Sequence, residues 1–139
     1  MANHDYFKDN IQWDGTSEYP PEFRHMPEMP GIEASPGLTL RPFWGKNVMA
    51  SYVAFEPGAV APIHQHPQEQ LSIVISGRLY FTVGTESRWM EPGDIVSIPP
   101  NVPHAAQAGE EGCVGIDMFN PPRDGFRALL DQQAGETGE

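Results

Sequence analysis

Residues 38–120 form a succession of short apolar runs separated by turn residues, and this spacing constrains the fold more than any other feature. The runs are rich in β-branched and aromatic residues, which favour strands. Glycine and proline mark their ends, as at residues 56–58 and 91–94. Strands that recur about every 8–12 residues without a helical period are typical of a β-sandwich or barrel. The sequence therefore predicts an all-β domain, in which many of the 14 glycines and 15 prolines form turns.

The same pattern gives the position of each strand and the extent of the barrel. Turns are expected at residues 76–77 and 109–112, among other separators. We assign the barrel to residues 37–122. The predicted strands are residues 38–41, 48–55, 60–66, 71–75, 78–83, 88–90, 95–98, 104–108 and 113–119.

The two ends of the chain differ from the strand region. Residues 1–36 combine several prolines with five aromatic side chains, which is too aromatic for a solvated tail. We expect an N-terminal arm that lies across the barrel or a neighbouring subunit, with a partly ordered leader as the alternative. In residues 123–139, the spacing of Phe126, Leu129 and Leu130 predicts a short C-terminal helix. The polar residues from 132 onward predict a frayed end.

Charge and composition exclude several classes of partner. The 8 basic and 19 acidic residues give a formal net charge of −11, which excludes nucleic acid because a polyanion is repelled at long range. No run of 18 apolar residues is present, so we expect no membrane span. The first residues lack a basic stretch followed by an apolar one, and Cys113 has no cysteine partner, so we expect a cytoplasmic protein. Because 139 residues are few for a barrel that buries a ligand, a homodimer is expected.

Three of the five histidines occur in contexts that favour metal binding. His64 and His66 are two residues apart in a predicted strand, so both imidazoles face the same side. Two adjacent imidazoles are a ready pair of metal ligands. His104 follows a rigid, proline-rich turn. His4 and His25 lack such a setting, and we interpret them as ordinary histidines.

These histidines lie within two longer motifs. The first contains Gly58, His64, His66 and Gly77, and the second contains Gly93, Pro99 and His104, with Asn101 at a position where glycine is usual. This order and spacing resemble the two motifs of the cupin family. The resemblance implies a double-stranded β-helix, which is a jelly-roll barrel with a metal inside one end. It also implies one divalent ion, for which Zn, Ni, Mn, Fe and Co all fit mixed nitrogen and oxygen ligands.

The fourth ligand position departs from the usual cupin motif, which has glutamate there. Six residues separate Gln70 from the motif glycine Gly77, and Glu69 directly precedes Gln70. Adjacent strand residues point to opposite faces, so only one of the two can face the metal. The spacing to Gly77 favours Gln70, with Glu69 as the alternative. Three histidines and a glutamine would leave the ion its full charge and make it a stronger electrophile.

The last predicted strand carries a second group of polar residues. Asp117 and Phe119 share a face, and Arg123 follows a Pro-Pro corner. If that face is the barrel interior, burial would raise the pKa of Asp117, as in a general acid or base. Arg123 could then bind a substrate carboxylate in bidentate fashion. The alternative is an Asp–Arg ion pair at the rim, with Phe119 in the core.

The full set of residues resembles one cupin subgroup, the KdgF-type cupins of pectin and alginate degradation. The resemblance rests on seven positions: His64, His66, Gln70, His104, Asp117, Phe119 and Arg123. It implies that the first four hold the metal and that the last three line the active site. The subgroup converts 4,5-unsaturated monouronates into the open-chain keto form. The expected function is therefore isomerase-type conversion of a small carboxylated sugar.

Three other functions fit the same ligand pattern. An iron or manganese cupin dioxygenase acting on a small aromatic or diketone would consume O2. A metal-dependent cyclase of small-molecule biosynthesis would need a wide pocket mouth. A non-enzymatic small-ligand-binding cupin would not need the acid–base group that Asp117 offers. Because a fold does not determine a substrate, the sequence leaves these alternatives open.

Overall fold

The computed structural model describes residues 6–7 and 11–136, so His4 lies outside the described residues. Strands dominate this part of the chain, in accord with the predicted all-β class. In chain order the elements are η1 (Met26–Glu28), β1 (Ile32–Ser35), β2 (Leu38–Trp44), β3 (Met49–Phe55), β4 (Val60–His64), β5 (Glu69–Val83), β6 (Glu86–Met90), β7 (Ile95–Ile98), β8 (His104–Asn120) and α1 (Gly125–Glu136).

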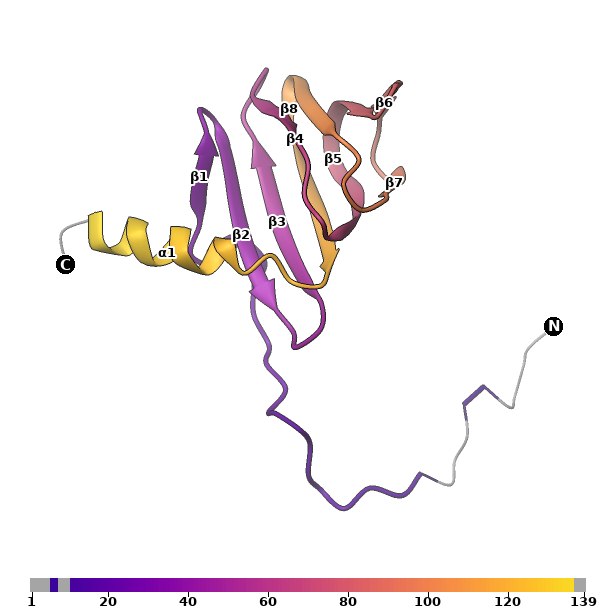
Figure 1. The fold of residues 1–139 in the computed structure, drawn as a ribbon, viewed down its shortest axis with the longest axis vertical. Helices are drawn as coiled ribbons and strands as arrows, with labels where there is room; N and C mark the ends of the chain where they lie inside the picture. Colours follow the sequence, from indigo (N-terminus) through magenta and orange to yellow (C-terminus); the bar gives the residue numbers. More distant parts are fainter. Residues whose placement is uncertain (1–5, 8–10, 137–139) are drawn as a thin grey trace.

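The strands form two antiparallel layers that share the two longest strands, β5 and β8 (Figure 1). The first half of β5 pairs with β7 and with the second half of β8, which also pairs with β3. The second half of β5 pairs with β6 and with the first half of β8, which also pairs with β4. β2 and β1 continue the first layer beyond β3. The predicted double-stranded β-helix is confirmed.

The structure corrects the expectation of turns at residues 76–77 and 109–112. Residues 71–75 and 78–83, predicted as two strands, belong to the single strand β5, and residues 104–108 and 113–119 belong to β8. The pairing of β5 with β8 shifts register around Ser76 and Gly77 instead of ending there. The glycines therefore bend the two strands at β-bulges, which sharpen a bend without reversing the chain.

Two glycines make this bend possible because the strands cross there at very close range. Gly77 and Gly112 both have left-handed backbones, with φ of 75° and 76°. A Cβ at position 77 would overlap the carbonyl oxygen of Gly112. A Cβ at position 112 would lie 2.6 Å from the carbonyl oxygen of Phe55. A side chain at either position would therefore clash with backbone that has no room to move.

The apolar core has two parts, and the C-terminal helix covers the smaller one. Phe126 of α1 packs edge-on against Phe119 of β8, with ring centroids 6.1 Å apart. The Gln133 side chain fixes the helix to β1, because it accepts from the Glu33 N–H at 2.9 Å and donates to the Gly31 carbonyl at 2.7 Å. Residues 132–136, expected to be frayed, continue this helix. The larger part of the core comprises Leu38, Val53, Phe55, Ala59, Val74, Leu79, Phe81, Met90, Ile98, Ala106, Ala108 and Cys113.

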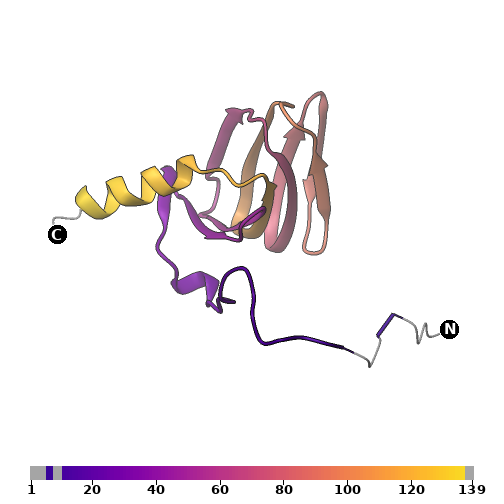
Figure 2. The same cartoon turned by 60° about the horizontal axis from the view of Figure 1, so that its bottom comes forward.

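Residues 11–25 extend away from the barrel rather than lying across it (Figures 1 and 2). Their aromatic side chains are exposed, and Phe23 is 92% exposed. An ion pair between Glu18 and Lys46 connects the arm to the loop between β2 and β3. No helix in the described part of the chain has both the length and the apolar character needed to span a bilayer.

The outer face of the sheet around β5 and β7 is also apolar and uncovered. Leu71, Ile75 and Ile95 are exposed on these strands. Ile95 pairs with Ile73, and Ile73 pairs with Ile116 of β8. An apolar row therefore crosses three strands on the side opposite to the barrel interior.

The Gly77–Gly112 crossing predicts a severe effect of one methyl group. Gly77→Ala is expected to lower the free energy of unfolding by roughly 3 kcal/mol or more, because backbone strain and a backbone clash add up. Gly58→Ala is the matched control, since Gly58 has nearly the same φ of 74° and nothing within 4 Å of an added Cβ. It should cost only about 1–2 kcal/mol of backbone strain. Equal losses in urea denaturation of the two variants would contradict the close crossing.

The exposed arm and the exposed sheet face together predict self-association. We propose a homodimer in which the aromatic arm of one subunit covers the apolar face of a second copy, because burial of both surfaces is favourable. Light scattering should give about twice the 15.4 kDa mass of one chain. Ile95→Glu, at a residue that is 56% exposed, should shift the mass toward that of one chain. Val60→Glu is the control, because Val60 is 42% exposed on β4, outside this face and outside the loop that pairs with the arm. A monomeric wild type would contradict the proposal.

Candidate metal centre and active site

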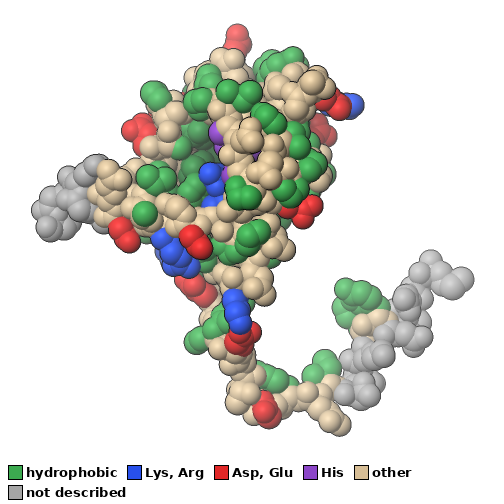
Figure 3. Space-filling view, in the orientation of Figure 1, with side chains coloured by type: hydrophobic (Ala, Val, Ile, Leu, Met, Phe, Trp, Pro, Cys, Tyr) green, Lys and Arg blue, Asp and Glu red, His purple; other side chains and the backbone are tan. Residues whose placement is uncertain are grey.

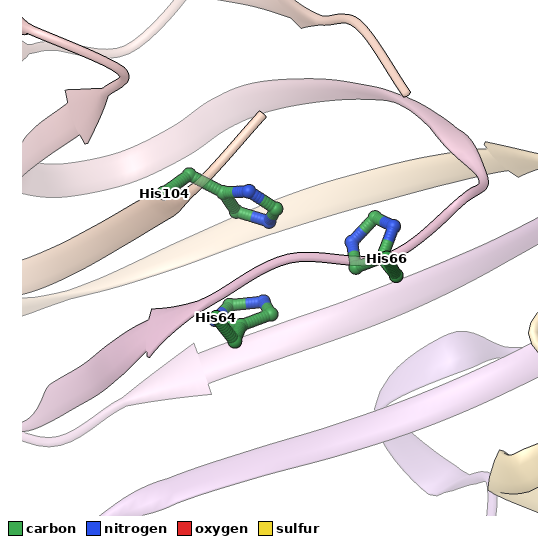
Figure 4. A group of neighbouring side chains, drawn as sticks. All are labelled: His64, His66 and His104. Carbon is green, nitrogen blue, oxygen red and sulfur yellow. The ribbon is translucent and has the colours of Figure 1, made fainter. Parts of the chain in front are cut away.

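Three histidines from two strands and a loop face one another at one end of the barrel (Figure 4). His64 is the last residue of β4 and pairs directly with His104, the first residue of β8. His66 follows two residues after β4. One ring nitrogen from each histidine lies within 4.8 Å of the others. The structure therefore brings together the three histidines that the sequence predicted as ligands, in positions that suit a metal ion.

The backbone fixes which nitrogen of each imidazole faces the centre of the group. Nδ1 of His64 lies 2.8 Å from the carbonyl oxygen of Pro62, and Nδ1 of His104 lies 2.9 Å from that of Val102. Nδ1 of His66 lies 3.1 Å from the carbonyl oxygen of Gln68. An Nδ1–H that donates to a carbonyl leaves the Nε2 lone pair free, which is the usual arrangement around metal-bound histidines.

The donor atoms at the centre fit a cation. Nε2 of His104 is buried and has no hydrogen-bond partner among the described residues. Nε2 of His66 lies 3.0 Å from Oε1 of Gln70. Burial, with the nearby charge of Arg123, lowers the pKa of His66 and so favours the neutral imidazole. Both ring nitrogens face a carbonyl-type oxygen, so the single nitrogen lone pair of the neutral ring meets an oxygen in either tautomer. A positive ion between these atoms would turn both unfavourable arrangements into ligation.

The structure places Gln70, and not Glu69, beside the histidines. Gln70 is the second residue of β5 and is only 4% exposed, whereas Glu69 is exposed. Alternation along the strand points the two side chains to opposite faces. The amide oxygen of Gln70 could therefore join His64, His66 and His104 as a fourth ligand.

Asn101 occupies the motif position where glycine is usual, and its backbone explains why. Its φ of 66° is left-handed, a conformation that asparagine tolerates better than most other residues. The Asn101 N–H donates to the carbonyl oxygen of His66 at 2.8 Å. The loop before His104 is thereby fixed to the loop that carries His66.

Asp117 lies on β8, between two strands whose side chains face the same cavity. Its Oδ1 accepts a hydrogen bond from the Ser72 hydroxyl at 2.7 Å. Burial raises the pKa of Asp117 to about 6, although the Ser72 hydrogen bond, the charge of Arg123 and the Gln70 amide act in the opposite direction. A carboxyl with a pKa near 6 can both release and accept a proton close to neutral pH.

Arg123 lies in the segment between β8 and α1, with its guanidinium between two aromatic rings. Its Cζ is 5.5 Å from the ring centre of Phe119 and 4.6 Å from that of Phe126. Its backbone N–H donates to Sδ of Met49 at 3.0 Å. The salt bridges among the described residues include neither Asp117 nor Arg123, so the predicted alternative of a rim ion pair is not seen there. Phe119 is buried and also contacts His66, with ring centres 5.6 Å apart.

A cavity of about 560 Å³ connects these groups. It is lined by His64, His104, Gln70, Asp117, Phe119 and Arg123, so the structure brings nearly all of the predicted site residues to one space. Figure 3 shows a hollow in the surface where histidine side chains and a basic side chain are visible together. Ile63 of β4 and Leu129 of α1 are exposed lining residues, which places the helix beside the opening.

Two lining residues, Ser51 and Ser72, were missed by sequence reasoning. Both are nearly fully buried, and both pair directly with Asp117 in the sheet. Strand alternation contains a signal for them, because Ser72 shares a face with Gln70 and Ser51 shares a face with Met49. Polar residues at such inward positions point to a polar cavity.

Comparisons with known proteins identify the family to which this chain belongs. The sequence model of the Cupin domain matches residues 51–119. The structure of KdgF from Halomonas sp. is 30% identical to this chain and has a TM-score of 0.71, over 77% of this chain and 99% of that one. The chain belongs to the cupin family. Its fold and histidine motifs thus agree with the resemblance seen in the sequence.

Two curated relatives of this cupin are isomerases. The H2HPP isomerase of Bacillus subtilis is 43% identical over 74 residues, which are 52% of this chain and 30% of that protein. The D-lyxose ketol-isomerase of Cohnella laeviribosi is 31% identical over 113 residues, which are 80% of this chain and 54% of that protein. The matches to these two relatives therefore span only about a third to a half of their length.

The buried histidine predicts a defined pH dependence of stability in the metal-free protein. Burial lowers the pKa of His104 to about 4, so between pH 6.5 and 4 the unfolded chain binds a proton that the folded chain does not. Acidification therefore removes up to about 3 kcal/mol of stability through His104. The pKa of Asp117 is raised, so acidification over nearly the same pH range increases the stability contribution of this residue. The quantity to measure is therefore the difference in the free energy of unfolding between wild type and a His104 variant, because the effect of Asp117 is present in both.

In chelator-treated protein, His104→Asn should gain stability relative to wild type as the pH falls from 7 to 4. Urea denaturation at several pH values checks this expectation. His25→Asn is the control, because His25 is exposed. A difference between His104→Asn and wild type that does not change with pH would contradict the low pKa.

Proposed function

We propose that this cupin is a metal-dependent isomerase that opens a small carboxylated sugar, such as a 4,5-unsaturated uronate, to its keto form. The observation that carries the proposal is the position of Asp117. Its carboxyl, with a pKa near 6, shares one cavity with the histidine group and with Arg123. The isomerase relatives and the resemblance to KdgF-type cupins support the same class of reaction.

Arg123 would bind the substrate carboxylate. Its guanidinium lines the cavity and is oriented by Phe119 and Phe126. A planar guanidinium can donate two parallel hydrogen bonds to a carboxylate, which fixes the orientation of the bound anion. Because the chain carries a net charge of −11, this local cation is needed to draw in an anionic substrate.

Asp117 would carry the proton during the reaction. Ring opening moves the proton of the anomeric hydroxyl to the ring oxygen as the bond between the anomeric carbon and that oxygen breaks. The resulting enol becomes a ketone when its hydroxyl proton is lost and the adjacent alkene carbon gains a proton. Both changes are internal proton transfers, so one carboxyl that accepts and returns a proton is sufficient.

The residues that would hold the metal are His64, His66, Gln70 and His104. When bound, a divalent ion supplies Lewis acidity toward a substrate oxygen. The four ligands are neutral, so they leave the full positive charge of such an ion in place. Phe119 would form the apolar wall that keeps the Arg123 guanidinium and the His66 ring in position.

The size and lining of the cavity favour a second candidate, a cyclase or isomerase that acts on a larger carboxylate with an apolar part. A volume of about 560 Å³ falls within the range of pockets for drug-sized ligands. Beyond the polar groups, the cavity is lined by Leu38, Val53, Phe55, Leu79, Phe81 and Met90. A sugar acid alone would leave much of this apolar surface uncovered.

Asp117→Asn tests the proposed chemistry. The variant keeps the shape of the side chain but cannot take up or release a proton, so turnover of a 4,5-unsaturated uronate should fall about 10²–10⁴-fold. The loss of ultraviolet absorbance from the conjugated double bond follows the reaction. Metal analysis should still find close to one ion per chain.

Asp131→Asn is the matched control, because Asp131 is exposed on α1 and should leave turnover unchanged. Full activity in Asp117→Asn would contradict the role of Asp117. If the wild type converts a larger aromatic carboxylate but not the uronate, the result would support the second candidate.

A further inference from the structure

A continuous chain of hydrogen bonds connects the metal-facing amide of Gln70 to the carboxyl of Asp117. Nε2 of Gln70 donates to Oγ of Ser72 at 2.8 Å. Oγ of Ser72 donates to Oδ1 of Asp117 at 2.7 Å. Ser72 is only 4% exposed, so water competes little for either bond.

The chemistry of the three groups fixes which group donates and which accepts in each of the two hydrogen bonds. The Gln70 amide points its oxygen at His66, so only its NH2 group faces Ser72, and that group can only donate. Ser72 must therefore accept there, and its single hydroxyl hydrogen is directed at Asp117. Oδ1 of Asp117 is thus held as an acceptor of the Ser72 hydroxyl.

The neighbouring strand provides a built-in comparison. Asp117 pairs with Ser72 of β5 on one side and with Ser51 of β3 on the other. Both serines are buried on the cavity side of the sheet. Ser72 is hydrogen-bonded to Asp117, whereas Oγ of Ser51 has no partner among the described residues. The two serines have the same side chain at equivalent positions but differ in this one bond.

We propose that Ser72 is a positioning residue that couples the metal ligand Gln70 to the acid–base residue Asp117. Through it, the amide oxygen of Gln70 is held toward the histidines while the carboxyl of Asp117 is held in one orientation by its Oδ1. A cation at Gln70 polarises the amide, and the effect passes along the two hydrogen bonds to Asp117. Coupling of this kind is reciprocal, so a change at Asp117 alters metal affinity through Ser72.

The proposal rests on the proposed function for the role of Asp117 but is tested without any substrate. Zn²⁺ affinity is measured by competition with a chromophoric chelator. Ser72→Ala should weaken Zn²⁺ binding by about 10–100-fold, as is usual when the partner of a metal ligand is removed. Ser72→Thr keeps the hydroxyl and should restore most of the affinity. Ser51→Ala removes a hydroxyl that holds no ligand and should leave the affinity within about threefold of wild type.

A double-mutant cycle separates the hydrogen-bonded route from simple charge attraction. Asp117→Asn removes a negative charge near the ion, and that part of its effect is the same in every background. The part that passes through Ser72 is lost in the Ser72→Ala background. The fold-change in affinity caused by Asp117→Asn should therefore be clearly smaller in Ser72→Ala than in wild type, and unchanged in Ser51→Ala.

Three outcomes would overturn the role of Ser72. These are an equal effect of Asp117→Asn in the wild-type and Ser72→Ala backgrounds, equal Zn²⁺ affinity of Ser72→Ala and wild type, or identical behaviour of Ser72→Ala and Ser51→Ala. If Ser72→Ala does not fold, Ser72→Cys replaces it, because a thiol is of similar size but a weak donor. Because metal affinity needs no turnover, the coupling can hold even if the uronate reaction fails, and the reverse also applies.

Discussion

The site depends on the sharp bend that β5 and β8 make together at Gly77 and Gly112. His104 begins β8 and Phe119 lies near its end, and a straight strand of that length would separate them by about 50 Å. In the folded barrel His66 lies within 5.0 Å of the His104 ring and within 5.6 Å of the Phe119 ring, measured between centroids. The bend closes this distance, and it requires two backbones to touch where neither can carry a side chain. The close contact of Gly77 and Gly112, which have no side chains, therefore allows the reactive side chains of the two strands to meet in one cavity.

The sequence was most informative where one strand or turn decides the outcome. The exclusion of Glu69 from the face of Gln70 and the joint inward facing of Asp117 and Phe119 follow from alternation along one strand. The predicted strand over residues 60–66 is shorter in the structure, because β4 ends at His64 and His66 lies in the loop that follows, although both imidazoles still reach the same site. The glycines near residues 77 and 112 were located but misread as chain reversals, because a left-handed residue serves a turn and a bulge equally well. The row of Ser51, Asp117 and Ser72 could not be predicted, because it depends on the register of three strands at once.

The electrostatics of the cavity work against stability. Burial holds His104 and His66 in their neutral forms and makes the ionised form of Asp117 unfavourable. Each shift means that the folded chain gives up a charged state that water would favour. The same shifts leave the imidazole lone pairs free for a cation and leave Asp117 able to exchange a proton near neutral pH. A bound ion would therefore both complete the site and restore stability, since it binds only the folded arrangement.

The C-terminal helix has a second significance beyond covering the core. Arg123 lies two residues before its start, Phe126 within it contacts the Arg123 guanidinium, and Gln133 fastens it to β1 beside the cavity. The cation expected to hold the substrate therefore belongs to an attachment on the barrel and not to the barrel wall that carries the histidines. Substitutions along α1 can shift this charge relative to the metal ligands while every strand stays in place. Within this architecture, substitutions in α1 would act on the residue that binds the ligand without replacing any of the four metal ligands.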